Sequence, residues 1–304
     1  MVLITGVTGF VGSNLKSYLI NKNKKVLGVS RMPSEHEVDY KQINTKLLNT
    51  TNTFIHLAGK AHDSKKNSDE AEYFTANTEL TKKMFDKFLK SSCETFIYLS
   101  SVKAAADDVA GILNEDCIPD PKTHYGKSKL LAENYILSNN INDKKVYILR
   151  PCMIHGPNNK GNLNLLYNLV SKRIPWILGS FQNKRSYCSL DNLMFIIKEI
   201  IMNNSIPPGV YNVADDECLS TNEIVKLISD SNNKKPIIFN VWPFVVKFIA
   251  KIGDIIPLPL NSERLKKLTE SYVVSNEKLK KYIAKEFPLN TKQGFIKTLK
   301  SFKN

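Results

Sequence analysis

Three side chains in the middle of the chain have the types needed to move a proton at an alcohol or carbonyl oxygen. Tyr125 and Lys129 are four residues apart, so a helix would place the phenol and the ammonium on one face. The cation can lower the pKa of the phenol and fit it for general acid/base catalysis. Ser101 follows an apolar run, and its hydroxyl can hydrogen-bond the same substrate oxygen. The alternative is a surface tyrosine beside two lysines.

A glycine motif, Gly6-Val-Thr-Gly9-Phe-Val-Gly12, follows the first apolar run and opens a helical pattern. Glycines let the backbone turn tightly and approach a pyrophosphate, and the helix N-terminus adds N–H groups and the positive end of its dipole. The spacing is G-x-x-G-x-x-G instead of G-x-G-x-x-G, and a glycine-rich turn without a ligand is the alternative. Its place between strand and helix favours dinucleotide binding.

The elements that must position these residues alternate between strands and helices. Short apolar runs predict buried parallel strands at 2–5, 26–29, 53–57, 95–99 and 145–149. Helical patterns lie at about 12–21, 72–90 and 126–140. We therefore expect an α/β fold, a Rossmann-type doubly wound parallel sheet with a smaller, mostly helical C-terminal substrate domain.

We expect the cofactor-binding domain to comprise residues 1–151 with a returning segment at about 182–213, and the substrate domain to comprise 152–181 and 214–304. Predicted elements beyond residue 151 are helices at about 162–173 and 190–203, a strand at 209–214, and a helix capped by Ser220 or Thr221.

Composition indicates an ordinary globular protein, with 304 residues, 42% of them hydrophobic and 24% charged. The 43 basic and 29 acidic residues leave a net charge of +14, which attracts polyanions. The lysines are scattered and no nucleic-acid motif accompanies them, so we expect solvated surface charge and no nucleic-acid partner. Five widely spaced cysteines without a Cys-x-x-Cys pair favour a reducing compartment and no metal site, and no signal peptide is evident, so we expect a cytoplasmic protein.

With these motifs in this order, the chain resembles the extended short-chain dehydrogenase/reductase superfamily, in its NAD-dependent epimerase/dehydratase branch that acts on nucleotide sugars. Within that branch it is most similar to bacterial surface-polysaccharide enzymes that reduce or epimerise C4 of UDP-linked N-acetylated sugars. The motifs that carry the resemblance span nearly the whole chain: Gly6 to Gly12, His56-Leu-Ala-Gly59, Asn77, Ser100-Ser101, Tyr125 to Lys129, Arg150-Pro151, His155-Gly-Pro157, Gly179 to Arg185, Leu190-Asp-Asn192 and Trp242-Pro243.

The resemblance implies a role for each matching position. Ser101, Tyr125 and Lys129 would be catalytic, and Asn77 would support the active-site backbone. Lys103, Asn162 and Arg185 would bind the substrate, with Asn162 and Arg185 at the nucleotide diphosphate. His56 to Gly59 would line the cofactor pyrophosphate, with Cys152 near the nicotinamide. The cofactor-binding set would be Gly6, Thr8, Gly9, Phe10, Val11, Gly12, Ser30, Arg31, Leu57, Ala58, Gly59, Tyr125, Lys129 and Pro151.

Two departures from the family pattern narrow the chemistry. Dehydratases of this family place an acidic pair directly after the hydroxyl residue, whereas Val102-Lys103 follows Ser101 here, which argues against a dehydratase. Members that prefer NAD place Asp or Glu at the end of the second strand, whereas this chain has Ser30-Arg31, which suits a 2′-phosphate. We therefore expect NADP as the preferred cofactor and keep NAD as the alternative.

The stretch Trp242 to Ile252 predicts an amphipathic helix. Its apolar positions are Phe244, Val245, Phe248, Ile249 and Ile252, with Lys247 and Lys251 expected opposite them. We expect this apolar face to pack against the substrate domain, and the alternative is contact with a membrane surface or a lipid-linked substrate.

The predicted function is reduction at C4 of a UDP-4-keto-6-deoxy-N-acetylhexosamine for surface polysaccharide. The alternatives are a UDP-sugar 4-epimerase of the UDP-GlcNAc or UDP-glucose type and, from another class, a catalytically silent NADP-sensing or scaffold protein. A homodimer is also compatible with the sequence.

Overall fold

A seven-stranded parallel sheet forms the centre of the larger part of the molecule in a computed structural model of the chain. The structure describes residues 1–61, 70–141, 143–159, 161–256 and 260–303. The strand order is β10-β7-β5-β4-β1-β2-β3. The strands are β1 (Val2–Thr5), β2 (Val26–Ser30), β3 (Glu37–Asp39), β4 (Thr53–His56), β5 (Thr95–Leu99), β7 (Lys145–Pro151) and β10 (Gly209–Val213). The predicted doubly wound sheet is confirmed, and β3 is an edge strand that the sequence did not reveal.

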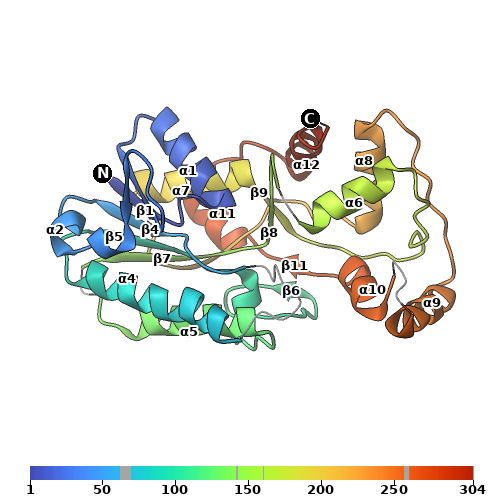
Figure 1. Cartoon of the computed structure of the whole chain (residues 1–304), viewed down its shortest axis with the longest axis horizontal. Helices are drawn as coiled ribbons and strands as arrows, with labels where there is room; N and C mark the ends of the chain where they lie inside the picture. The colour runs from blue at the N-terminus through green and yellow to red at the C-terminus, as the bar shows by residue number, and fades with distance from the viewer. Residues whose placement is uncertain (62–69, 142, 160, 257–259, 304) are drawn as a thin grey trace.

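Helices cover both faces of this sheet (Figure 1). On one face lie α1 (Phe10–Asn21), α7 (Leu190–Met202) and α11 (Glu277–Ile283), and on the other α2 (Thr45–Leu48), α4 (Leu80–Leu89) and α5 (His124–Ser138). Each helical layer packs against the sheet and forms an apolar core with it. Leu15 and Ile196 belong to the core on the first face, and Phe85 and Ile136 to the core on the second. Burial on both faces explains why the strand sequences are almost continuously apolar.

Segments far apart in sequence join the sheet to a second, mostly helical part. Strand β6 (Ile112–Leu113) pairs with β11 (Val273–Val274), and β8 (Met153–His155) pairs with β9 (Tyr187–Ser189). Helix α12 (Thr291–Lys300) packs on β9, where the ring of Phe295 stacks on buried His155 with centroids 4.1 Å apart. These strand pairs and the packing of α12 therefore connect the second part to the first at several points.

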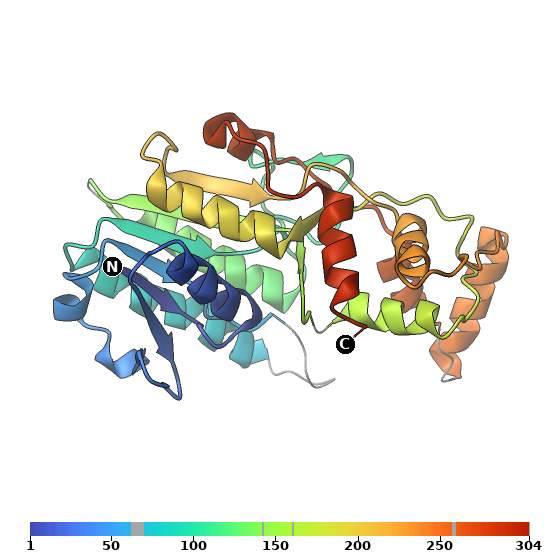
Figure 2. The ribbon, with the colours of Figure 1, turned by 90° about the horizontal axis from the view of Figure 1, so that it is seen from above.

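The second part consists of α6 (Asn162–Ser171), α8 (Thr221–Ser231), α9 (Pro243–Ile255) and α10 (Ser262–Thr269), at the far end of the molecule from β2 and β3 (Figures 1 and 2). Ser220 caps α8 in a reciprocal capping box with Glu223, as the sequence predicted. Among the described residues, no helix is both long enough and apolar enough to cross a bilayer.

Helix α9 forms where the sequence places it, but it packs on a different face from the one expected. Val246, Ala250 and Gly253 are buried, whereas Phe244 and Phe248 are exposed. The lysines Lys247 and Lys251 therefore lie on the exposed side together with the phenylalanines, not opposite them. The expected packing of Phe244 and Phe248 against the substrate domain is wrong.

Candidate active site

The carboxyl ends of the central parallel strands bring the predicted site residues to one edge of the sheet. The glycine motif follows β1, Ala58 and Gly59 follow β4, Ser101 follows β5, and Pro151 ends β7. Strands β1 and β4 are neighbours, as are β5 and β7. The chain leaves β1 toward β2 on one side and returns at β4 on the other, which is the topological position where open α/β sheets bind ligands.

The glycine motif forms a turn that side chains would block. Gly6 has a φ of +68°, and a Cβ at Gly12 would lie 2.2 Å from the carbonyl oxygen of Gly6. Helix α1 begins at Phe10, directly after this turn, and no side chain caps its first turn. The backbone N–H groups there, with the dipole of α1, fit the pyrophosphate of a dinucleotide. Thr8 is exposed beside them, and Phe10 and Val11 are half-buried.

Ser101 and Tyr125 come together from two different elements. Ser101 starts the short 3₁₀-helix Val102–Ala104 after β5, and its Oγ accepts a hydrogen bond from the Lys103 N–H at 3.2 Å. Tyr125 lies in the first turn of α5, which Thr123 caps through the N–H of Gly126. Burial raises the pKa of the Tyr125 phenol, and a side-chain hydrogen bond with Ser101 opposes this shift. The two hydroxyls can therefore bind the same substrate oxygen.

Lys129 is one turn farther along α5, and its side chain is buried, with 4% of the residue exposed. Its Nζ donates to the carbonyl oxygen of Leu99 at 2.9 Å and lies 4.8 Å from the centroid of the Tyr98 ring. Burial lowers the pKa of Lys129 to about 8, and the nearby Glu133 carboxylate opposes this shift. An ammonium poised near neutral pH is suited to electrostatic support of a titrating phenol.

Asn77 ties the backbone after β4 to α5. It lies, fully buried, in a π-helical turn over Phe74–Glu79. Its Oδ1 accepts from the Lys60 N–H at 2.8 Å, and its Nδ2 donates to Ser128 Oγ at 3.0 Å. A Cβ at Gly59 would lie 2.6 Å from Asn77 Oδ1 and 3.3 Å from Lys129 Nζ. Asn77 therefore has the supporting role that the resemblance implies, and it sets Gly59 beside Lys129.

Glu133 is a component that the sequence analysis missed. Its carboxylate, fully buried, accepts from Arg150 Nε at 3.0 and 3.1 Å, from Arg150 Nη2 at 2.5 Å, and also from Ser100 Oγ. The pair joins α5 to β7, and the two partners of Glu133, Ser100 and Arg150, are next in sequence to Ser101 and Pro151. The spacing of Glu133 four residues after Lys129 was the available signal, since it places both charges on one helix face.

The side chain of His56, which the resemblance places along the cofactor pyrophosphate, lies in the protein core. Its ring is fully buried, with Nδ1 2.7 Å from Thr5 Oγ1 and Nε2 3.1 Å from Thr81 Oγ1. Burial lowers the pKa of His56 to about 3, and the Lys129 cation adds to this shift. His56 is thus a neutral core residue that spaces β1, β4 and α4. Cys152, expected near the nicotinamide, is a buried residue whose thiol pKa is raised by burial.

Of the predicted substrate-binding residues, Arg185 and Lys103 carry cations that already contact the protein. Arg185 Nη1 donates to the carbonyl oxygen of Lys267 at 2.6 Å, and its Nη2 lies 3.4 Å from Glu270 Oε1. Lys103 Nζ donates to the carbonyl oxygen of Asp107 at 2.7 Å and lies 4.4 Å from the Tyr272 ring centroid. Asn162 begins α6, and its side chain lies outside the described part of the chain.

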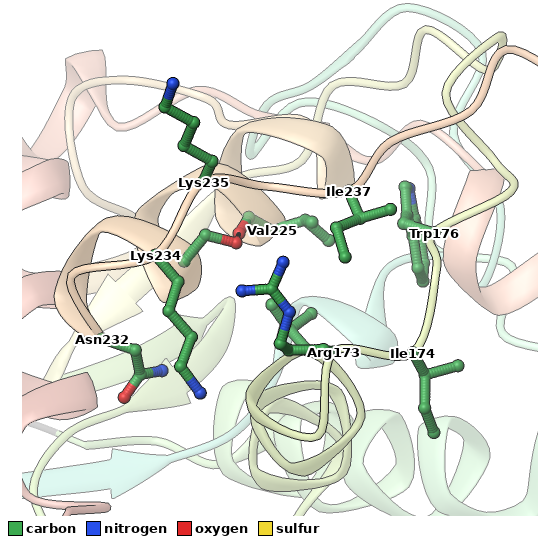
Figure 3. A pocket seen from close by; sticks show the side chains of 10 residues that line it. Arg173, Ile174, Trp176, Val225, Asn232, Lys234, Lys235 and Ile237 are labelled. Carbon is green, nitrogen blue, oxygen red and sulfur yellow. Dashed lines mark hydrogen bonds between the residues drawn. The ribbon is translucent and has the colours of Figure 1, made fainter.

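A polar hollow of about 600 Å³ is lined by residues between Gly179 and Lys184, by the start of α8, and by Ile238 and Asn240. Asn222 fixes this segment, because its Nδ2 donates to the carbonyl oxygens of Gly179 and Phe181 at 3.0 Å each. Figure 3 shows a different hollow, where Arg173, Lys234 and Lys235 lie around the end of α8. Its volume of about 10 Å³ holds one water at most, so this basic cluster is not a substrate pocket.

Beside the glycine turn and the end of β2, the structure adds residues that the sequence analysis missed. At the end of β2, Ser30 is buried and Arg31 is exposed. Tyr40, from the segment after β3, accepts a hydrogen bond from the Gly6 N–H at 3.1 Å. Glu37 on β3 pairs with Lys16 at 2.8 Å, which neutralises a carboxylate beside β2. Long-range pairing of β3 with β2 is what brings Tyr40 and Glu37 here.

The chain matches the NAD dependent epimerase/dehydratase family over residues 2–214. The chain belongs to this family. It is 28% identical to a UDP-glucose 4-epimerase of Vibrio cholerae over 317 residues, covering 99% of this chain and 95% of the relative. The predicted superfamily and the prediction of an NAD(P)-dependent enzyme are confirmed at the level of the family.

Two further relatives come from Escherichia coli. One is named N-acetyl-alpha-D-glucosaminyl-diphospho-ditrans,octacis-undecaprenol 4-epimerase and is 26% identical, covering 93% of this chain and 85% of the relative. The other is a dTDP-4-dehydro-6-deoxyglucose reductase, 25% identical, covering 78% and 83%. A solved UDP-glucuronic acid 4-epimerase from Bacillus cereus in complex with NAD has a TM-score of 0.78 at 18% identity, covering 99% of this chain and 98% of that one. This last similarity shows the shared fold.

Proposed function

We propose that this family member exchanges hydride at C4 of a UDP-linked sugar, with Ser101, Tyr125 and Lys129 as its catalytic residues. The observation that carries the proposal is the convergence of these three side chains with Gly59 at the carboxyl edge of the sheet. When bound, the nicotinamide supplies or accepts the hydride. The glycine turn and the uncapped first turn of α1 support binding of the dinucleotide there.

The protein's own groups handle the proton. Tyr125 donates to or accepts from the sugar O4, and Ser101 holds the same oxygen through its hydroxyl. The Lys129 ammonium favours the ionised phenol electrostatically. Glu133 and Arg150 keep the ends of β5 and β7 in register with α5, so the geometry is set before substrate binds.

For the direction of the reaction we propose reduction of a UDP-4-keto-6-deoxy-N-acetylhexosamine with NADPH. Ser30 and Arg31 support NADP because neither repels a 2′-phosphate. Val102 and Lys103 occupy the two positions where a dehydratase needs an acidic pair. Val102 is buried, and the Lys103 ammonium donates to the carbonyl oxygen of Asp107. The reductase relative supports the same assignment.

A 4-epimerase that retains NAD is the second candidate. It is favoured by the two epimerase relatives, which cover 99% and 93% of this chain, compared with 78% for the reductase. Epimerase and reductase would share Ser101, Tyr125 and Lys129 and differ in whether the cofactor leaves after each turnover. NAD is then the cofactor, which the NAD-bound solved neighbours also support.

For the substrate we propose that Arg185, with Lys103 and Asn162, holds the diphosphate, since a guanidinium binds phosphate oxygens in pairs. Arg185 would exchange Glu270 and the Lys267 carbonyl for the ligand. The polar hollow lined by the neighbouring Lys184 is large enough for part of a nucleotide. We further propose that residues 1–151 and 182–213 hold the cofactor and the remainder holds the substrate. A lipid-linked sugar diphosphate is the alternative substrate form, favoured by the name of one relative.

Two measurements test this function. Acid treatment of the purified protein, followed by identification of released nucleotide, should yield no stoichiometric NAD from a reductase, and the protein should bind added NADPH. A UDP-4-keto-6-deoxy-N-acetylhexosamine should then oxidise NADPH in equal amount, with the new C4 configuration read by NMR. Stoichiometric bound NAD, with conversion of UDP-GlcNAc to UDP-GalNAc, would replace the reductase by the epimerase. Absence of both reactions would overturn the C4 assignment.

A further inference from the structure

Helix α9 presents an apolar face that the rest of the described chain leaves uncovered. Trp242 is 69% exposed, Phe244 64%, Phe248 65% and Ile255 87%. Phe244, Phe248 and Ile255 follow one another at intervals of four and seven residues, so they form one stripe along the helix. The Trp242 ring packs edge-on against Phe244, with centroids 5.6 Å apart. Together these four residues define the α9 outer face.

The α9 outer face is not needed to hold α9 in place. The opposite side of the helix is buried through Val246 and Ala250, which join a core cluster with Trp176, Val225 and Leu265. At the end of the helix, a Cβ at Gly253 would lie 1.9 Å from the carbonyl oxygen of Leu260, so the backbone packs there without a side chain. The exposed aromatic rings are therefore held on a fixed support and contribute little to the core.

Positive charge accompanies the α9 outer face. Lys251 falls within the stripe and Lys247 beside it, and both are exposed. Within the described residues, neither makes an ion pair or a side-chain hydrogen bond. The chain as a whole carries a net charge of +14. The surface thus combines aromatic rings, aliphatic side chains and unpaired ammonium groups, which is the composition of helices that lie in the interface of an anionic bilayer.

We propose that the α9 outer face docks the protein on an anionic membrane surface, with α9 lying in the plane of the interface. A helix of 13 residues is about 20 Å long and too short to span the bilayer, but it suits the headgroup boundary. Pairing with a second copy through the same face would bring Lys247 and Lys251 toward their own counterparts. Charge complementarity therefore favours lipid over a second copy. The proposal does not depend on the reaction assigned to the site.

The position of α9 makes docking compatible with access to the site. Helices α9 and α10 pack together, and the carbonyl oxygen of Lys267 on α10 is the acceptor for Arg185. Figures 1 and 2 show α9 at the outer end of the second part, away from α1 and α7. A protein docked through α9 would hold its cofactor-binding sheet away from the lipid and leave the catalytic edge free.

Flotation of the full chain with lipid vesicles tests the proposal. We expect binding to vesicles that contain phosphatidylglycerol and much weaker binding to pure phosphatidylcholine vesicles. The double variant Phe244→Ser/Phe248→Ser should weaken binding by roughly tenfold or more, because two aromatic side chains no longer leave water. Lys247→Gln/Lys251→Gln should weaken binding to the anionic vesicles by about thirtyfold, from about 1 kcal/mol per lysine.

Matched controls change exposed apolar residues and exposed lysines elsewhere. Ile118→Ser/Leu137→Ser removes two exposed apolar side chains from the first part, and Lys22→Gln/Lys25→Gln removes two exposed charges. Both should bind as the wild type does. Absence of wild-type flotation, equal binding of all four variants, or equal binding to both kinds of vesicle would overturn the proposal. Self-association that the Phe244→Ser/Phe248→Ser variant abolishes, without vesicle binding, would instead assign the face to a second copy.

Discussion

Buried Lys129 should make the protein less stable at neutral pH than a variant without it. Burial lowers the pKa of Lys129 from 10.5 to about 8, so the folded state holds the proton more weakly than the unfolded chain. A difference of about 2.5 between the two pKa values corresponds to ~3 kcal/mol of unfolding free energy. The side chain is too buried for solvent to screen much of this.

The sign of the pH dependence follows from proton counting. Below pH 8 both states are protonated, and the folded state carries the whole penalty. Between pH 8 and 10.5 the unfolded state binds more protons, so wild-type stability rises with pH relative to a variant without the amine. The free energy of unfolding of Lys129→Met should therefore exceed that of the wild type most below pH 8. This difference should fall by about 2 kcal/mol between pH 8 and pH 9.5.

Urea unfolding of the cofactor-free protein at pH 7.5, 8.5 and 9.5 measures this difference. The variant also loses the hydrogen bond to the Leu99 carbonyl and the contact with the Tyr98 ring. These losses change the free energy of unfolding by the same amount at every pH, so they do not alter how the difference between variant and wild type depends on pH. Lys25→Met removes an exposed ammonium and serves as the control. If the difference in free energy of unfolding between Lys129→Met and wild type stays constant from pH 7.5 to 9.5, that result refutes the reasoning, whatever the size of the difference. Lys129→Met should also be inactive.

Four further changes probe the site. Tyr125→Phe should retain fold and cofactor binding but turn over roughly 10²-fold more slowly, measured on the true substrate, and near wild-type turnover would remove the phenol from the mechanism. Arg31→Asp should shift preference from NADP to NAD; titration showing that the wild type already prefers NAD tenfold, or ~1.4 kcal/mol, would contradict this. Arg185→Ala should weaken UDP binding by ~2 kcal/mol in calorimetry and leave cofactor affinity within about twofold; equal loss for both ligands would indicate misfolding. Gly12→Ala should abolish cofactor binding, whereas Gly161→Ala, where a Cβ meets nothing within 4 Å, should not.

Hydrophobic periodicity predicts the strands and helices whose buried residues are regularly spaced. It fails for elements whose buried residues are not. The strands of the central sheet were predictable because both faces are buried and their residues are almost all apolar. Strand β3 (Glu37–Asp39) has one apolar residue among three and lies half-buried at the sheet edge. The predicted helix at 72–90 is interrupted by the π-helical turn that buries Asn77, and hydrophobic spacing does not reveal such a turn.

The same limit separates the site residues that the sequence predicts from those it does not. Tyr125 and Lys129 are related by one helical turn, so local spacing suffices to place them together. Glu133 and Arg150 meet only because β7 lies where α5 packs, and Tyr40 reaches Gly6 only because β3 pairs with β2. Such partners depend on tertiary pairing, and the residue types alone do not specify it.

Helix α9 shows how a correct period can give the wrong buried face. A helix with phenylalanines on one side and Val246, Ala250 and Gly253 on another has two sides able to pack. The small side allows closer approach, down to backbone contact at Gly253, and still buries apolar surface. Burying the phenylalanines instead would also bury Lys251, which falls between Phe248 and Ile255 on the same stripe, in an apolar contact. The lysine on that stripe is therefore the feature that decides which face turns outward, and it is visible in the sequence once the helix is drawn residue by residue.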